Sequence, residues 1–129
     1  MPQDSRGQPP LIERESFAVE QCGDMTIIRL VDPWHFETVE YAQIQQELMD
    51  FVERRQPRHL LVDLANIEYC ATALINALLM AQGRVHAGSG EMKLFGLHGG
   101  MLEAMQHAKL IDTMFSVYSD EAAARNACL

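Results

Sequence analysis

The chain has 129 residues, a length that fits one domain built around one core. Hydrophobic residues make up 48% of it and charged residues 22%, and the formal net charge at pH 7 is −8. That acidic balance argues against nucleic acid and against an anionic membrane surface as partners, because both attract basic patches and no basic cluster here exceeds Arg54-Arg55.

The N-terminal third of the chain predicts an arm, a hairpin and a helix. Residues 1–12 are mostly polar and rich in proline and glycine, which is typical of a disordered arm, and residues 13–129 then form the domain. Weak alternation over 16–22, a Gly23-Asp24 turn and a β-branched run over 25–31 predict two antiparallel strands. The clearest helix spans 38–56, with an apolar stripe at Tyr41, Ile44, Leu48, Phe51 and Val52.

The middle of the chain carries the stretch on which the functional hypothesis depends. Residues 60–64 form a short apolar run that predicts a strand covered on both faces. From Ala73 onward, apolar residues recur at helical spacing, at Leu74, Ala77, Leu78, Ala81 and Val85. Thr72 precedes this helix directly, so we expect its hydroxyl to cap the positive end of the helix dipole.

The C-terminal third predicts two more strands, each followed by a helix. Gly88-Ser89-Gly90 is a stop signal, 91–97 a strand, and Gly99-Gly100 the start of a helix. Residues 115–118 form a last strand, and Ser119 or Asp120 can cap a helix over 121–127. The resulting order predicts a small α/β domain: a mixed sheet of about five strands with an N-terminal hairpin, right-handed crossovers and about four helices.

This layout resembles the STAS family, the domain shared by sulphate transporters and bacterial anti-sigma-factor antagonists. The similarity covers about residues 17–124 and rests on three stretches. Residues 62–75, VDLANIEYCATALI, are similar to the family's strand followed by a D-S/T-S-G-L-type turn that opens an apolar helix. Residues 88–94 match its glycine turn and next strand, and residues 109–115, KLIDTMF, resemble its G-L-x-x-x-F-type segment. The resemblance implies a STAS-like single domain.

The resemblance also implies a function and a site. In the family's antagonists, the hydroxyl residue of the motif is phosphorylated by an anti-sigma factor that is also a kinase, and this position falls on Thr72. The expected partner is therefore a GHKL-type Ser/Thr kinase acting as anti-sigma factor, and ATP belongs to that partner. The expected contact residues surround the turn: Tyr69, Cys70, Ala71, Ala73, Ile75, Asn76 and Met80, together with Trp34 and His35. Trp34 is either a lid on the core or an exposed hot spot beside the turn.

A second hypothesis shares the fold but not the switch. Ala71 stands where the family has an acidic residue, Leu74 where it has a glycine, and Trp34 or His35 where an acidic residue usually follows the second strand. These departures favour a non-phosphorylated scaffold, as in a stressosome-like assembly or a lipid-transport ABC system. A homodimer is compatible with either hypothesis, because the apolar face of the 73–87 helix is wide.

Enzymatic activity is not expected. No Ser/His/Asp or Cys/His set has supporting context, and no cofactor or metal is predicted, because none of the histidines has a ligand partner at a suitable spacing (His35, His59, His86, His98, His107). Cys22 and Cys70 are expected half-buried in a reducing cytosol, with Cys128 a loose tail thiol. The chain has no apolar run of bilayer length and no signal peptide, so we expect a soluble, cytoplasmic protein.

Overall fold

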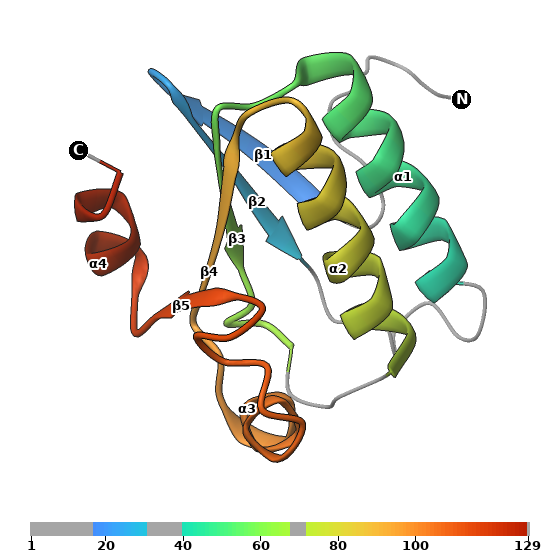
Figure 1. The fold of residues 1–129 in the computed structure, drawn as a ribbon, viewed down its shortest axis with the longest axis vertical. Coiled ribbons are helices and arrows are strands. Elements are labelled where there is room, and N and C mark those ends of the chain that lie inside the picture. The colour runs from blue at the N-terminus through green and yellow to red at the C-terminus, as the bar shows by residue number, and fades with distance from the viewer. Residues whose placement is uncertain (1–16, 31–39, 68–71, 129) are drawn as a thin grey trace, which may run out of the picture.

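The computed structural model describes residues 17–30, 40–67 and 72–128. These residues contain five strands and four helices in the predicted order (Figure 1). The elements are β1 (Phe17–Cys22), β2 (Met25–Leu30), α1 (Glu40–Arg55), β3 (His59–Asp63), α2 (Thr72–Ala87), β4 (Glu91–Phe95), α3 (Gly99–His107), β5 (Ser116–Tyr118) and α4 (Glu121–Asn126). The predicted N-terminal arm, residues 1–12, lies outside the described residues.

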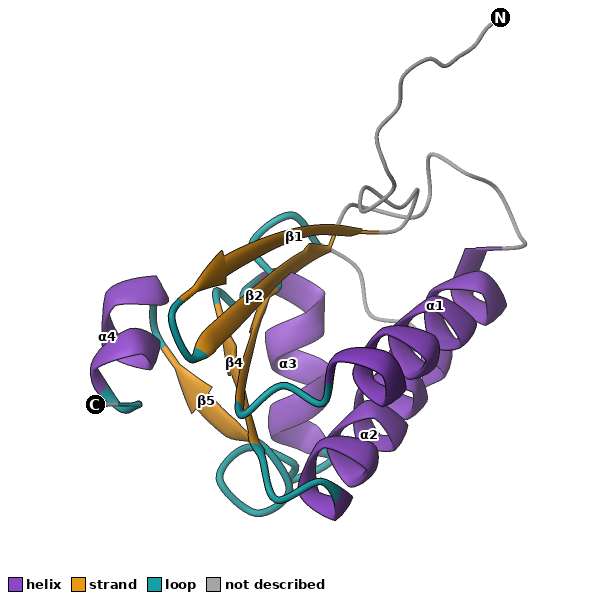
Figure 2. Ribbon diagram, turned by 90° about the horizontal axis from the view of Figure 1, so that it is seen from above, coloured by secondary structure: helices purple, strands orange, loops and turns teal. Residues whose placement is uncertain are grey.

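The strands form one mixed sheet in the order β1-β2-β3-β4-β5. β1 and β2 pair antiparallel as the predicted hairpin, and every later neighbouring pair is parallel. Since each parallel strand is added beside the previous one, right-handed crossovers place the intervening helices on the same face of the sheet. Figure 2 shows α1 and α2 side by side on one face and α4 on the other. The predicted fold class is confirmed.

The main core lies between the sheet and the crossover helices. Ile44, Leu48, Phe51 and Val52 of α1 are buried there, as the apolar stripe predicted. The ring of Phe51 meets that of Phe17 edge-on, with 6.0 Å between centroids. The buried α2 stripe packs beside them, as predicted, through Leu74, Ala77, Leu78, Ala81 and Val85. Burial of these side chains fixes how α2 is rotated on the sheet, and therefore which of its residues face outward.

The opposite face of the sheet has a smaller core under α4. Ile27, Leu61 and Phe95, from three adjacent strands, are covered by Ala124 of this six-residue helix. Asp120 caps the helix by accepting a hydrogen bond from the Ala123 N–H at 2.9 Å. The interpretation of Cys128 as a loose tail thiol is wrong. It is half-buried against this cluster, and burial raises the pKa of its thiol.

An ionic network holds α4 against this second face. The guanidinium of Arg29 on β2 contacts Glu20 at 2.7 Å, Asp63 at 2.9 Å and Glu121 at 3.1 Å. On α4, Arg125 pairs with Glu121 at 2.7 Å. Hydrogen bonding from Arg29 is the main cause that lowers the pKa of both Glu20 and Glu121. The Arg29 guanidinium thus joins β1, β2 and β3 to α4. Because this short helix makes few apolar contacts, the ion pairs help to hold it on the sheet.

Candidate functional site

The loop after β3 prepares the position of Thr72. Asp63 ends the strand, and its Oδ1 accepts a hydrogen bond from the Ala65 N–H at 2.9 Å, which is an Asx-type turn. The N–H of Ile67 then donates to the Leu64 oxygen at 3.0 Å, and the Ile67 side chain is buried. The loop thus leaves the sheet in a defined direction before residues 68–71, which lie outside the described residues.

A second loop holds the first one in place. Between β4 and α3, the His98 ring nitrogen Nε2 lies 2.8 Å from the Ala65 oxygen. Gly96 adopts φ +82°, and a Cβ on it would lie 3.0 Å from the Ala65 nitrogen, closer than side chains normally approach. The segment between β4 and α3 therefore also supports the loop that leads to Thr72. No residue spacing in the sequence indicated this role of His98.

Thr72 is the first residue of α2, and its side chain is exposed. The helix thus begins one residue earlier than the Ala73 expected from the pattern. Because Thr72 lies within the helix, the N-cap position falls on residue 71, which lies outside the described residues, and capping by the Thr72 hydroxyl stays a prediction. The hydroxyl nevertheless lies at the positive end of a 16-residue helix, beside N–H groups that have no partner within the helix. An added phosphate would be electrostatically favoured there.

The outward face of α2 continues from Thr72. Ala73 and Asn76 are exposed, and Met80 has an exposed fraction of 44%. Thr72, Asn76 and Met80 are spaced four residues apart, so they lie along one face over about 12 Å. We call Thr72, Ala73, Asn76 and Met80 the α2 docking face. Ile75, the remaining predicted contact residue in the described part of the chain, is half-buried and packs against the main core, as does Leu79. They border this face.

Five predicted contact residues cannot be placed. Tyr69, Cys70, Ala71, Trp34 and His35 lie outside the described residues, so their roles stay predictions. Among the residues that the structure describes, no cluster of His, Cys, Asp or Glu could hold a metal ion. In the same residues, no helix is both long and apolar enough to cross a bilayer. The α2 docking face offers an exposed hydroxyl, a side-chain amide and a thioether, which suit protein contact and modification of the hydroxyl.

Comparisons with known proteins agree with this architecture. The model of the STAS domain family matches residues 16–124. An anti-sigma factor antagonist from Mycobacterium paratuberculosis superposes with a TM-score of 0.73 at 16% identity, covering 87% of this chain and 92% of that one. A STAS-domain protein from Planctomyces limnophilus, described as an anti-sigma-factor antagonist, gives 0.72 at 24% identity, covering 87% and 97%.

A third solved structure is the Bacillus cell fate determinant SpoIIAA in its phosphorylated form. It has a TM-score of 0.61 at 16% identity, covering 87% of this chain and 99% of that one. At such identities the structural similarity shows the fold alone, and no curated protein matches the sequence. The family model spans most of the chain and coincides with the observed β1-to-α4 order, so the chain belongs to the STAS domain family.

Proposed function

We propose that this protein is an anti-sigma-factor antagonist in a partner-switching circuit, controlled by phosphorylation of Thr72. The observation that carries the proposal is the exposed Thr72 side chain at the start of α2, adjoining the exposed Ala73, Asn76 and Met80. If other residues of the chain buried the Thr72 hydroxyl, neither a kinase nor a partner could reach it. The antagonist and phosphorylated relatives of the same fold support the assignment.

The switch follows from the electrostatics of the helix start. The unphosphorylated protein presents a small, nearly neutral surface over which a partner can pack, with Met80 as its apolar part. A phosphate on Thr72 adds a charge of about −1.5 to −2. The helix tolerates that charge, but a partner surface that is apolar or acidic at the contact does not. The partner is a GHKL-type Ser/Thr kinase that is also the anti-sigma factor, and it supplies the ATP; this chain binds and does not catalyse.

Two substitutions at Thr72 test the switch. Thr72→Ala removes the hydroxyl with little change in surface, so it should retain partner binding. Thr72→Glu introduces a charge at the contact and should weaken binding at least tenfold, by calorimetry with the purified kinase. Ala122→Glu is the matched control, because it adds the same charge at an exposed position of α4 on the opposite face. Equal affinity of the Ala and Glu variants at Thr72 would rule out the switch.

A methionine pair tests the location of the contact. Met80, with 44% of its surface exposed, belongs to the α2 docking face, and Met114, with 52% exposed, lies before β5. They are the two large hydrophobic side chains exposed in the described part of the chain. Met80→Ala should lower partner affinity about fivefold or more, as for a residue inside an interface, while Met114→Ala should not. A stronger effect at Met114 would move the docking site to the other flank of α2.

One observation favours the scaffold alternative. Leu74, which stands where the family motif has a glycine, is fully buried in the main core. The turn has thus exchanged a backbone-flexible residue for a packing residue, and Ala71 replaces the acidic one. A non-phosphorylated subunit of a stressosome-like or lipid-transport ABC assembly would tolerate both changes. Intact-mass analysis after incubation with ATP and the cognate kinase separates the two: one added phosphoryl group, absent from Thr72→Ala, supports the switch, and its absence supports the scaffold.

A further inference from the structure

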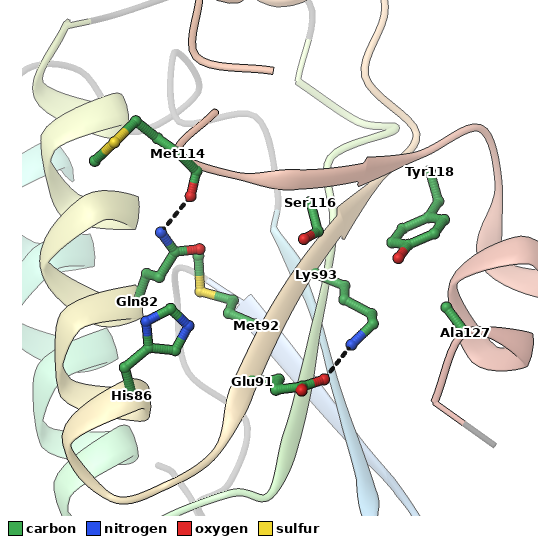
Figure 3. A pocket seen from close by; sticks show the side chains of 9 residues that line it. All are labelled: Gln82, His86, Glu91, Met92, Lys93, Met114, Ser116, Tyr118 and Ala127. Atoms are coloured by element: carbon green, nitrogen blue, oxygen red, sulfur yellow. Dashed lines mark hydrogen bonds and ion pairs between the residues drawn. The ribbon is translucent and has the colours of Figure 1, made fainter. Parts of the chain in front are cut away.

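A polar pocket lies at the other end of α2 from Thr72. The last turns of α2, the start of β4, the residues around β5 and the end of α4 surround a volume of about 370 Å³ (Figure 3). Its lining residues are Gln82, His86, Glu91, Met92, Lys93, Met114, Ser116, Tyr118 and Ala127. The volume lies within the range of small-molecule sites.

Lys93 is the group that makes this pocket unusual. It is one of two lysines in a chain of net charge −8, and only 8% of its side-chain surface is exposed. An ammonium group removed from water is stable only beside an anion. Its nitrogen Nζ lies 2.7 Å from Oε1 of Glu91, which supplies the negative charge (Figure 3).

Glu91 is a loosely held partner for so buried a cation. Its side chain is 63% exposed, so most of its surface is in contact with solvent and not with the rest of the protein. Other basic groups face the same point, since Nδ1 of His59 lies 4.0 Å from Glu91 Oε1. That Nδ1 is buried and has no hydrogen-bond partner among the described residues. The hydrogen bond and charge of Lys93, and then the charges of His59 and His86, lower the pKa of Glu91.

We propose that this pocket binds a small carboxylate-bearing molecule, whose carboxylate replaces that of Glu91 on Lys93. The lining residues Ser116, Tyr118 and His86 bring hydrogen-bonding groups for the ligand's oxygens, and Met92, Met114 and Ala127 add apolar surface at separate points of the lining. A single negative charge fits better than a phosphate dianion. Among the lining residues Lys93 is the one lysine or arginine, and it balances one charge. This inference is independent of the switch at Thr72.

Titration of the full chain with short carboxylates tests the site. Acetate, butyrate and succinate are added at constant ionic strength while amide shifts are followed by NMR, with chloride and inorganic phosphate as comparison anions. We expect saturable shifts at Lys93, Ser116 and Tyr118 with at least one carboxylate. Chloride should produce none, and phosphate should bind more weakly. Phosphate binding more tightly than every carboxylate would overturn the ligand class.

Two variants and one matched control decide the mechanism. Lys93→Met should weaken carboxylate binding at least tenfold, whereas Lys109→Met, the same change at the exposed second lysine, should not. Glu91→Gln removes the internal competitor and should tighten binding about fivefold, because the ligand no longer has to displace a carboxylate from Lys93. Unchanged or weaker binding by Glu91→Gln overturns the proposal, and this result holds even when Lys93→Met fails to fold. Absence of saturable binding by any carboxylate overturns it as well.

Discussion

The imidazole of His98 lies with Nε2 2.8 Å from the backbone oxygen of Ala65, and this contact joins the loop after β4 to the loop that leads into α2. Because the Ala65 oxygen can only accept, the His98 tautomer or cation must carry a proton on Nε2. Through this contact, His98 supports the loop that leads to Thr72, although the two residues lie far apart in the sequence.

Replacing His98 with alanine should loosen this loop. Loss of the hydrogen bond is expected to lower the free energy of unfolding by about 1 kcal/mol, measured by urea denaturation. Amide exchange at Ile67 should accelerate more than exchange in β3, because the loop opens locally. His107→Ala, at an exposed position of α3, is the control. Identical exchange at Ile67 in both variants would show that His98 does not anchor the loop.

The two glycines after α2 should differ sharply in their tolerance of alanine. A Cβ on Gly90 would collide with the Pro57 oxygen and lie 3.0 Å from Cγ1 of Val85. On Gly88 the nearest atom would be the Val85 oxygen at 3.7 Å, an ordinary contact. We expect Gly90→Ala to cost about 2–4 kcal/mol of stability. Gly88→Ala should be within about 0.5 kcal/mol of the parent in the same denaturation experiment.

The Arg29 network should make the fold sensitive to acid. The pKa values of Glu20 and Glu121 are lowered in the folded protein, mainly by hydrogen bonds from Arg29. A lowered pKa stabilises the fold above the unfolded value of about 4.3, and that stabilisation is lost as pH falls through the folded values. The urea concentration at which half of the protein is unfolded should therefore decrease once the pH drops below about 4.5.

Arg29→Met should flatten this acid dependence. It should also lower the midpoint at pH 7, because Glu20, Asp63 and Glu121 would then repel one another. Arg54→Met serves as control, since Arg54 is exposed on α1. Parallel pH profiles for the Arg29 variant and the parent would contradict the assigned role.

Thr72→Glu should be harmless to the fold even where it blocks a partner. A carboxylate at the first residue of α2 interacts favourably with the helix dipole, by about 0.3–1 kcal/mol. Its melting temperature should therefore equal or exceed that of Thr72→Ala, with a difference that shrinks in high salt. A strongly destabilised Thr72→Glu would mean that lost binding reports unfolding and not charge at the interface.

The sequence pattern predicts the layout well because periodicity and burial express the same physics. The stripe from Ile44 to Val52 packs against one surface, so its spacing reveals the helix. The run in β2 is buried on both faces of the sheet, so its β-branched composition, and not its spacing, reveals the strand. The exposed placement of Thr72 also follows from spacing, since the buried α2 stripe begins at Leu74 and Thr72 lies two residues before it, at the helix start.

The pairings that join distant segments could not be predicted. Arg29 and Glu121 are 92 residues apart, and nothing in their local sequence indicates the contact. Lys93 alternates with apolar neighbours in β4, which suggests a solvent-facing residue, yet it is buried on the face of the sheet that α4 covers. Such placements depend on register and on which face α4 covers, so they appear only when the whole chain is folded.

The cover of the second sheet face has a practical consequence. A helix of six residues has little intrinsic stability, so the ion pairs of Arg29 and Arg125 add to the apolar contacts that keep it over Ile27, Leu61 and Phe95. High salt screens those charges and exposes the apolar surface of the three strands to other molecules. The protein should thus stay monodisperse in buffer of low ionic strength, and high salt should promote its self-association.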